Sequence, residues 1–295
     1  MIGRITSTTM TQETLRTLQS NLAERERLQN QASSQRAFRT PSEDPAAAAT
    51  TLGVHGEQSR VAQFARNISD GMAWVTTVDT ALAASVDLVG RARDLTVRGA
   101  NSGALSDVAR EAIAAELDSI GEELLAQANT TVLGRSVFAG TGDAGAAFDQ
   151  TTFAFLGTGT SGVNRRISET ESVRVDADGV QAFGEGPDSV FALVRDIATE
   201  LRGGADVGAR LDDVDARLTA MVTAQATTGA RQAQIERAAA QNLSVATDLE
   251  ARRAEVENVD SLEVLVKLQS AEIVYQSALQ VTARSLQTNL LEFLR

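Results

Sequence analysis

The chain lacks cysteine and has a single histidine, His55. These absences exclude disulfide bonds, thiolate chemistry, His-rich metal sites and catalysis by a paired histidine. Aromatic residues make up only 4% of the 295 residues, and there are only three prolines. Such a composition favours long helices over sheets. We therefore expect a mainly α protein that is not an enzyme, with no catalytic residues, no cofactor and no metal.

Positive charge is also scarce, because 39 acidic residues against 27 basic ones give a formal net charge of -12. A protein whose main partner is nucleic acid needs a basic surface, so we expect no nucleic acid partner. No run of eighteen apolar residues is present, and we expect no membrane span. Residues 1–20 lack the apolar core of a cleavable signal peptide, so export would require another route.

The strongest pattern lies in residues 261–295, where no proline or glycine interrupts the apolar residues. Their spacing predicts one long amphipathic helix with a near-heptad repeat. One seam position holds Leu265, Leu279, Leu286 and Phe293, the other holds Leu268 and Tyr275, and Leu290 adds to the stripe. Burying about six such residues contributes about 12 kcal/mol. Ordering the helix costs about 1–2 kcal/mol per residue, so it needs partner helices.

The amino-terminal end predicts a second amphipathic helix, because apolar residues recur at helical spacing. They are Leu15, Leu18, Leu22 and Leu28. This end is locally basic and the carboxyl-terminal stretch is mildly acidic, so the two ends are electrostatically compatible. We expect the two helices to pair with each other. The alternative is that each end packs on a separate part of the molecule.

Several local signals divide the middle of the chain. Pro41 ends the first helix, Asp44 can cap the next, and Pro45 fits its first helical position. Residues 99–103 break that helix, Ser106 caps another, and the two should fold back as an antiparallel pair. A further helix follows residues 187–188 and ends at 203–204. Heptad spacing then continues from about residue 207 to a flexible point at 258–260.

Between residues 140 and 186 glycine and threonine become frequent and helical spacing disappears. Short alternations at 152–155 and 172–175 predict a small β-rich insertion. The glycine-rich run 157–162 lacks the lysine and following helix of a phosphate loop, and we interpret it as a turn. Carboxylates in this insertion could suggest an active site, but strand alternation and turns account for them.

Three segments resemble the bacterial flagellin family and its junction relatives. The stretch around Pro41, Ser42, Asp44 and Pro45 resembles the segment that closes the amino-terminal region of the family. Residues 260–262 and 276–294 look like the family's carboxyl end. The run at 128–140 resembles the hook-associated branch next to the filament, and it carries Asn129, Gly134, Arg135, Phe138 and Gly140. Departures are Gln35 and Ala37 in place of the usual Gly and Arg, and Glu43 in place of Asp.

The resemblance implies a flagellin-like, long helical coiled-coil bundle formed by the amino- and carboxyl-terminal halves, with a small β-rich outer insertion. It implies three parts. The terminal helices, 1–45 plus 261–295, pair as an inner axial domain. The ranges 46–140 plus 187–260 form a helical bundle, and 141–186 form an outward-facing domain. The axial contacts between subunits would use Leu15, Leu18, Leu22, Leu265, Leu268, Tyr275, Leu279, Leu286, Leu290 and Phe293.

The resemblance also implies a structural role in the bacterial flagellum, as an extracellular adaptor between the hook side and the flagellin filament. The expected partners are further copies of the chain in a ring, the adjacent hook-associated junction protein, flagellin, and an export chaperone at the carboxyl-terminal helix. Export would run through the flagellar secretion channel. A filament-forming flagellin is the alternative within the family. A coiled-coil signalling module is the alternative of another class, but it would require a membrane anchor or an input domain.

Overall fold

The computed structural model describes residues 2–100, 106–142, 145–158 and 161–293. Helices dominate it, as the composition predicts, and the strands are short. The elements in chain order are α1 (Ile2–Ser34), α2 (Pro45–Ala100), α3 (Asp107–Ala128), β1 (Thr131–Val132), β2 (Arg135–Ser136), β3 (Asn164–Arg166), β4 (Ser172–Arg174), α4 (Gly179–Phe183), η2 (Gly186–Asp188), α5 (Val190–Arg202), η3 (Gly208–Arg210), α6 (Leu211–Glu257) and α7 (Ser261–Phe293). The mainly helical flagellin-like fold with a small strand-bearing insertion is therefore confirmed.

Contacts divide the chain into two compact units. The first unit contains residues 1–60 and 246–295, and the second contains residues 61–245. Helices α2 and α6 contribute residues to both units, so each unit is built from the two halves of the chain. The three-part division inferred from the resemblance stays a prediction.

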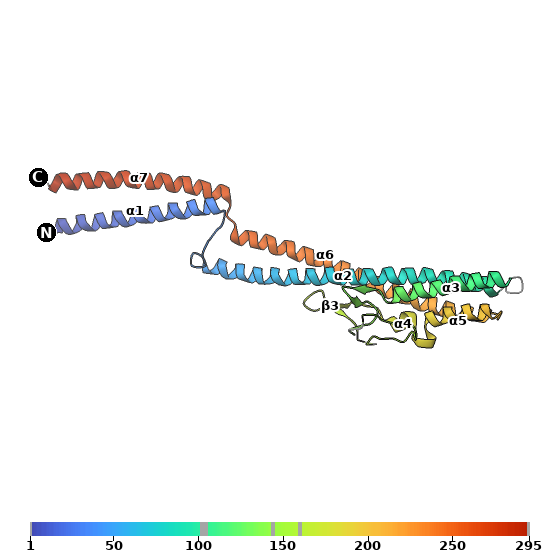
Figure 1. Cartoon of the computed structure of the whole chain (residues 1–295). Coiled ribbons are helices and arrows are strands. Elements are labelled where there is room, and N and C mark those ends of the chain that lie inside the picture. Colours follow the sequence, from blue (N-terminus) through green and yellow to red (C-terminus); the bar gives the residue numbers. More distant parts are fainter. Residues whose placement is uncertain (1, 101–105, 143–144, 159–160, 294–295) are drawn as a thin grey trace. The chain divides into compact units, whose positions relative to one another are not determined.

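In the first unit, α1 and α7 lie side by side (Figure 1). The expected pairing of the two ends is therefore present within one chain. Two backbone hydrogen bonds tie the segment after α1 to the segment before α7. The N–H of Ala37 donates to the carbonyl of Glu257 at 2.7 Å, and the N–H of Val259 donates to that of Gln35 at 3.2 Å. The break between α6 and α7 falls at residues 258–260, as the sequence predicts.

The start of α2 follows the capping chemistry read from the sequence. Oδ1 of Asp44 accepts hydrogen bonds from the backbone N–H groups of Ala46 and Ala47, at 3.1 and 2.9 Å. Pro45 is the first residue of α2, where its missing N–H costs nothing. The helix then continues through Gly53 and Gly56 without a break. The stop and start predicted at residues 41–45 are confirmed.

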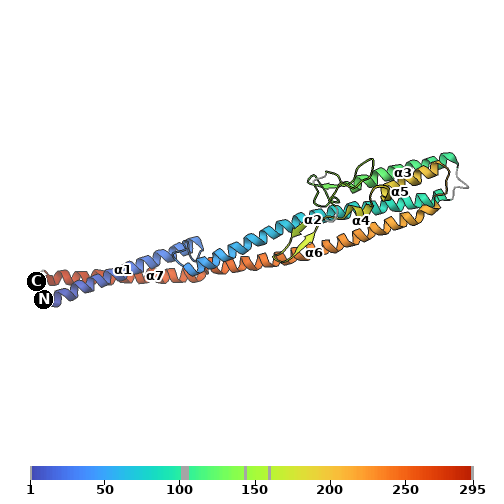
Figure 2. The ribbon, with the colours of Figure 1, turned by 90° about the horizontal axis from the view of Figure 1, so that it is seen from below.

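In the second unit, α2, α3, α5 and α6 surround one hydrophobic core (Figure 2). Ser106 caps α3 as predicted, because its Oγ accepts a hydrogen bond from the N–H of Ala109 at 3.3 Å. An ion pair of 3.0 Å between Arg91 and Glu116 joins α2 to α3. α6 contacts α2 through the side-chain amide of Asn242, which donates to the carbonyl of Val61 at 3.1 Å.

The insertion contains fewer strand residues than the sequence suggests. β3 and β4 form one antiparallel ribbon, and β4 coincides with the predicted alternation at 172–175. The second alternation gives only an isolated bridge between Phe148 and Phe155. Turns and the short helix α4 make up much of the rest of the described insertion. Part of the glycine-rich run, residues 159–160, lies outside the described residues.

Helix α2 contains a stretch that is long and apolar enough to cross a membrane by length and composition alone. Of that stretch, 44% is buried inside the protein. Trp74, Val75, Val78 and Leu82 of α2 belong to the core of the second unit. The apolar character of α2 is therefore explained by packing.

Candidate assembly surfaces

The contact between α1 and α7 follows a heptad pattern on both helices. On α7 the buried and half-buried positions alternate by four and three residues, and they are Val264, Leu268, Ala271, Tyr275, Ala278 and Thr282. On α1 the matching positions are Thr14, Leu18, Asn21, Arg25, Leu28 and Ala32. Because the two helices pack along each other, these stripes form their interface.

This interface is weakly apolar for a helix pair. Only Leu28 and Val264 among the stripe residues are buried. The guanidinium of Arg25 lies 5.0 Å from the centre of the Tyr275 ring, a distance typical of a cation–π contact. Beside it, a hydrogen bond from Arg27 lowers the pKa of Glu24. Since so few large apolar side chains are covered, the pairing within one chain provides little hydrophobic stabilisation.

The structure separates the predicted axial contacts into two groups. Leu18, Leu22, Leu268 and Tyr275 are half-buried between α1 and α7, whereas Leu15, Leu265 and Leu279 are exposed. Leu286, Leu290 and Phe293 belong to α7, but their side chains lie outside the part of the structure that is described. The exposed group is free to contact another molecule, and whether the whole set makes axial contacts stays a prediction.

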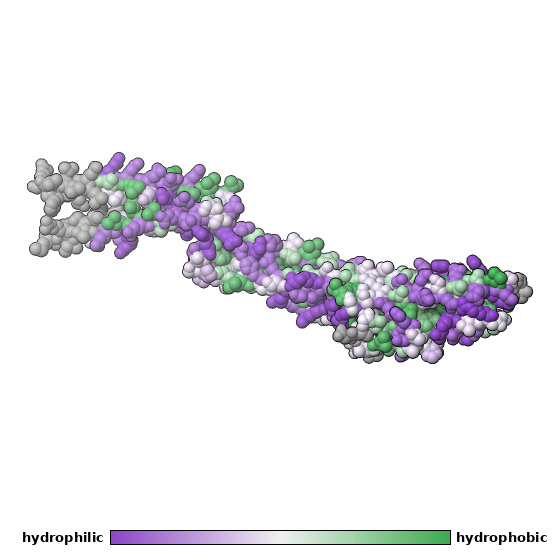
Figure 3. All heavy atoms as spheres, in the orientation of Figure 1, coloured by the Kyte–Doolittle hydropathy of each residue, from purple (hydrophilic) through white to green (hydrophobic). Residues whose placement is uncertain are grey.

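A second apolar face on α7 lies away from α1. Leu262, Val266 and Ile273 are 76%, 66% and 65% exposed. At 100° per residue they fall within about 40° of one another and roughly opposite the α1-facing stripe. Sequence reasoning missed Val266 and Ile273, because it followed leucine spacing and did not project the β-branched residues. Figure 3 shows hydrophobic and hydrophilic residues interspersed on the surface of the α1 and α7 pair.

The proline-flanked motif at 41–45 is a self-contained turn. The hydroxyls of Thr40 and Ser42 lie 2.9 Å apart. Oε2 of Glu43 accepts a hydrogen bond from the N–H of Arg39 at 2.9 Å, and the N–H of Glu43 donates to the carbonyl of Thr40 at 3.0 Å. Together with the Asp44 cap, these bonds fix the direction in which the chain enters α2. The motif therefore has a structural explanation in this fold.

In the second motif, Asn129 connects the end of α3 to the insertion. Its Oδ1 accepts hydrogen bonds from the N–H groups of Ala147 and Phe148, both at 2.8 Å, and its Nδ2 donates to the carbonyl of Phe148 at 3.1 Å. Ala147 and Phe148 are buried, so these backbone groups would otherwise lack partners away from water. A side-chain amide supplies both the acceptor and the donor that this geometry requires.

Gly134 and Arg135 belong to a β-hairpin in which a two-residue turn joins β1 to β2. Leu133 and Gly134 form its turn, with φ of 51° and 79°. Positive φ at both central residues is the type I′ arrangement, which favours glycine or asparagine. Leu133 is 90% exposed, and Arg135 is exposed beside it. The hairpin therefore places an apolar and a basic side chain on the surface.

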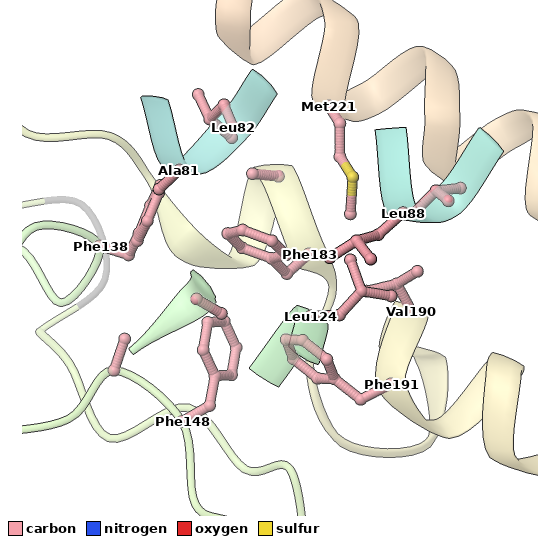
Figure 4. Packing of buried hydrophobic residues seen from close by; sticks show 14 of the residues in the cluster. Ala81, Leu82, Leu88, Leu124, Phe138, Phe148, Phe183, Val190, Phe191 and Met221 are labelled. Carbon is pink, nitrogen blue, oxygen red and sulfur yellow. The ribbon is translucent and has the colours of Figure 1, made fainter. Parts of the chain in front are cut away.

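Phe138 lies in an aromatic cluster that joins the insertion, including its helix α4, to α5 (Figure 4). Its ring meets that of Phe183 edge to face at 5.1 Å, and Phe148 meets Phe191 at 5.3 Å. All four rings are fully buried. Gly140 follows with φ of 68°, and a Cβ there would lie 2.5 Å from the carbonyl oxygen of Ser161. Only glycine fits that position without a shift of the backbone.

Comparisons with known proteins agree on one family for both halves of the chain. The bacterial flagellin N-terminal helical region matches residues 5–143, and the bacterial flagellin C-terminal helical region matches residues 211–294. A curated relative is Flagellar hook-associated protein 3 of Salmonella typhimurium, which is 28% identical over 181 residues. That alignment covers 61% of this chain and 56% of the relative, so the chain matches little more than half of the relative's length.

Solved structures share the fold at low identity. FlgL from Bacillus cereus is 19% identical with a TM-score of 0.57, over 67% of this chain and 99% of that one. FlgL from Xanthomonas campestris is 17% identical with a TM-score of 0.60, over 67% and 98%. A flagellar hook-associated protein-3 from Legionella pneumophila is 14% identical with a TM-score of 0.59, over 69% and 98%. At these identities the similarity shows the fold alone.

Proposed function

Because the chain belongs to the bacterial flagellin family, we propose that it is a structural junction protein that connects the hook side of the flagellum to the flagellin filament. The observation that carries this proposal is the similarity to Flagellar hook-associated protein 3 over 181 residues. The run from Asn129 to Gly140, which resembles the same branch, supports it. The role is mechanical, and the protein acts outside the cell at the junction.

The first unit supports an assembly role in physical terms. Its terminal helices cover each other with a weakly apolar stripe, and α7 keeps a second apolar face open. An exposed apolar face of this kind is stabilised when other subunits cover it. We therefore assign the open face of Leu262, Val266 and Ile273 to contacts between subunits. The predicted contacts Leu15, Leu265 and Leu279 are also exposed, and we assign them to the same kind of contact. The predicted contacts at Leu286, Leu290 and Phe293 would continue the same surface.

The proposed partners follow from the position at a junction. Copies of the chain form a ring, the adjacent hook-associated protein lies below it, and flagellin lies above it. Before assembly, an export chaperone covers the carboxyl-terminal helix. The open face of α7 supports this last partner as well, because such a face needs cover while the chain is a monomer.

A strain that lacks the chain tests the function. Microscopy shows what remains on the cell, and electrophoresis of the medium shows whether flagellin is shed. We expect hooks without filaments and flagellin released as monomer. Hooks without filaments and without shed flagellin would instead mean that this chain is the filament subunit. Normal filaments would contradict the proposal and favour the signalling alternative.

A substitution on the open part of α7 tests the surface. Leu279→Asp is expected to leave the melting temperature of the monomer nearly unchanged, because the side chain is 42% exposed. Incorporation into flagella should be lost, because a carboxylate would be buried between subunits. Leu279→Met, which conserves volume, should incorporate normally. A large drop in the monomer's melting temperature for Leu279→Asp would place this residue in the monomer core instead.

A further inference from the structure

Leu133, in the turn of the β1 and β2 hairpin, is unfavourable in two ways that no contact within the chain offsets. Leu133 adopts a positive φ of 51°, which a leucine side chain disfavours. It is also 90% exposed, so it gains no packing inside the molecule. The base of the hairpin is anchored, because Ser136 and Val137 are buried. A strained and exposed leucine at the tip of an anchored hairpin points to a contact outside the chain.

The positive charge beside Leu133 limits the kind of partner that the hairpin tip can bind. Arg135 is exposed, and among the described residues its guanidinium has no hydrogen bond or ion pair. The tip therefore presents one apolar and one cationic group. Its partner needs a shallow apolar depression with excess negative charge beside it. A second copy of this acidic chain, with a net charge of -12, is a natural source.

The second unit contains a depression with these properties at the start of α3. It has a volume of about 620 Å³, and its apolar lining comes from Val108, Ala112 and Ala115. Val108 is 81% exposed. At its edge Arg110 pairs with Asp107, and Arg202 pairs with both Glu111 and Asp118. The lining itself holds two carboxylates and two guanidinium groups, and Asp118 beside it supplies a third carboxylate, which is complementary to Arg135.

The hairpin and the depression cannot meet within one molecule. They lie at opposite ends of α3, whose 22 residues span roughly 33 Å. A contact between them must therefore join two copies that are staggered along α3. It is heterologous, because each copy uses one patch on its neighbour and offers the other, and such contacts close into rings when the rotation allows.

We propose that the Leu133 and Arg135 tip of one copy docks in the depression at the start of α3 of the next copy. Leu133 inserts against Val108, Ala112 and Ala115, and Arg135 pairs with Asp118 beside the depression. This inference rests on the proposed function and deepens it, because it names one contact between the subunits of the ring.

The absence of cysteine allows a direct test. The double variant Leu133→Cys with Val108→Cys is expressed in the deletion strain, and isolated flagella are oxidised. We expect a ladder of cross-linked multimers on non-reducing electrophoresis that collapses to monomer with reductant. An intramolecular disulfide is impossible, because it requires Cα atoms within about 7 Å. Each single variant, and the matched pair Leu133→Cys with Val222→Cys, should remain monomeric.

Three results would overturn the inference while the proposed function stands. One is the absence of a ladder from flagella in which the double variant has restored filaments. Another is efficient dimer formation by Leu133→Cys alone, which would mean that two hairpins face each other. The third is cross-linking to a different flagellar protein, which would replace the proposed partner. Normal filaments in the deletion strain would instead remove the proposed function, and the ring contact with it.

A substitution at the tip separates a structural role from a docking role. Leu133→Asn places asparagine before Gly134, the favoured sequence for a type I′ turn, so the monomer should melt at the same or a higher temperature. Incorporation into flagella should weaken about tenfold, because one buried leucine is lost from the contact. Unchanged incorporation would show that Leu133 makes no contact in the assembly.

Discussion

The side chain of Asn129 binds the backbone of Phe148 on both sides, accepting from its N–H at 2.8 Å and donating to its carbonyl at 3.1 Å. This pair joins the residue that follows α3 to a buried residue of the aromatic cluster. The insertion is therefore attached to the helical core by polar contacts as well as by ring packing. The same amide also accepts from the N–H of Ala147.

We predict that Asn129→Ala destabilises the second unit by about 3 kcal/mol. The substitution removes three hydrogen bonds and leaves buried backbone groups of Ala147 and Phe148 without partners. Chemical denaturation of the full chain, followed by circular dichroism, measures the loss. Glu122→Ala on the exposed side of α3 is the matched control and should change the free energy of unfolding by less than about 0.5 kcal/mol. Equal stability of Asn129→Ala and the unsubstituted chain would contradict this role.

Two glycines of the motif should respond differently to alanine. Gly134 has a φ of 79° but no atom near a new Cβ, so Gly134→Ala should cost only the backbone penalty, about 1–2 kcal/mol. Gly140 has a φ of 68°, and a Cβ there would also collide with the carbonyl oxygen of Ser161. Gly140→Ala should therefore cost clearly more. Thermal denaturation of both variants tests the order, and the reverse order would contradict the clash.

Helix boundaries were predictable because each depends on local chemistry. Asp44 and Ser106 cap helices that begin where the sequence indicates, and α7 begins after the predicted break at 258–260. A cap or a helix break depends on residues close in sequence, so no knowledge of the remaining fold is needed.

The phase of the carboxyl-terminal seam was harder to predict, because α7 is apolar on more than one face. Leucine spacing drew attention to Leu265 and Leu279, yet Val264 and Ala271 face α1. A helix with apolar residues on several faces does not reveal which face meets which partner. Only the position of α1 in the structure distinguishes them.

The insertion could be predicted as a change of composition but not as a set of contacts. Phe148, Phe183 and Phe191 have no common period, and their packing brings together residues far apart in the chain. Asn129 belonged to the motif by resemblance, but its bonds to residues 147 and 148 depend on the path of the insertion. Such contacts have no signature in local spacing.

Gln35 provides a prediction in the stabilising direction. It follows the end of α1 with a φ of 57°, in a position where the resemblance expects glycine. A left-handed backbone conformation costs a residue with a side chain about 1–2 kcal/mol, and glycine avoids this cost. Glycine loses more conformational entropy on folding, which offsets about 0.5–1 kcal/mol of the stabilisation. Gln35→Gly should therefore raise the stability of the first unit by up to about 1 kcal/mol.

The control for this prediction is Gln35→Ala, which keeps a Cβ in the same backbone conformation and should bring no gain. Thermal denaturation of the two variants beside the unsubstituted chain provides the comparison. A lower melting temperature for Gln35→Gly would mean that the Gln35 side chain contributes more than its backbone conformation costs.

The weakly apolar interface of α1 and α7 predicts how the monomer responds to protease. Trypsin under mild conditions should cut at Arg16, Arg25 or Arg27 and at Lys267 or Arg284, because few buried side chains oppose local opening there. The many arginines of residues 61–245 should be protected by the core of the second unit. Mass spectrometry of the digest identifies the resistant fragment. In the monomer, terminal helices as resistant as residues 61–245 would contradict the weak pairing of α1 and α7. In the assembled protein the terminal helices should resist trypsin, because neighbouring subunits then cover the open face of α7.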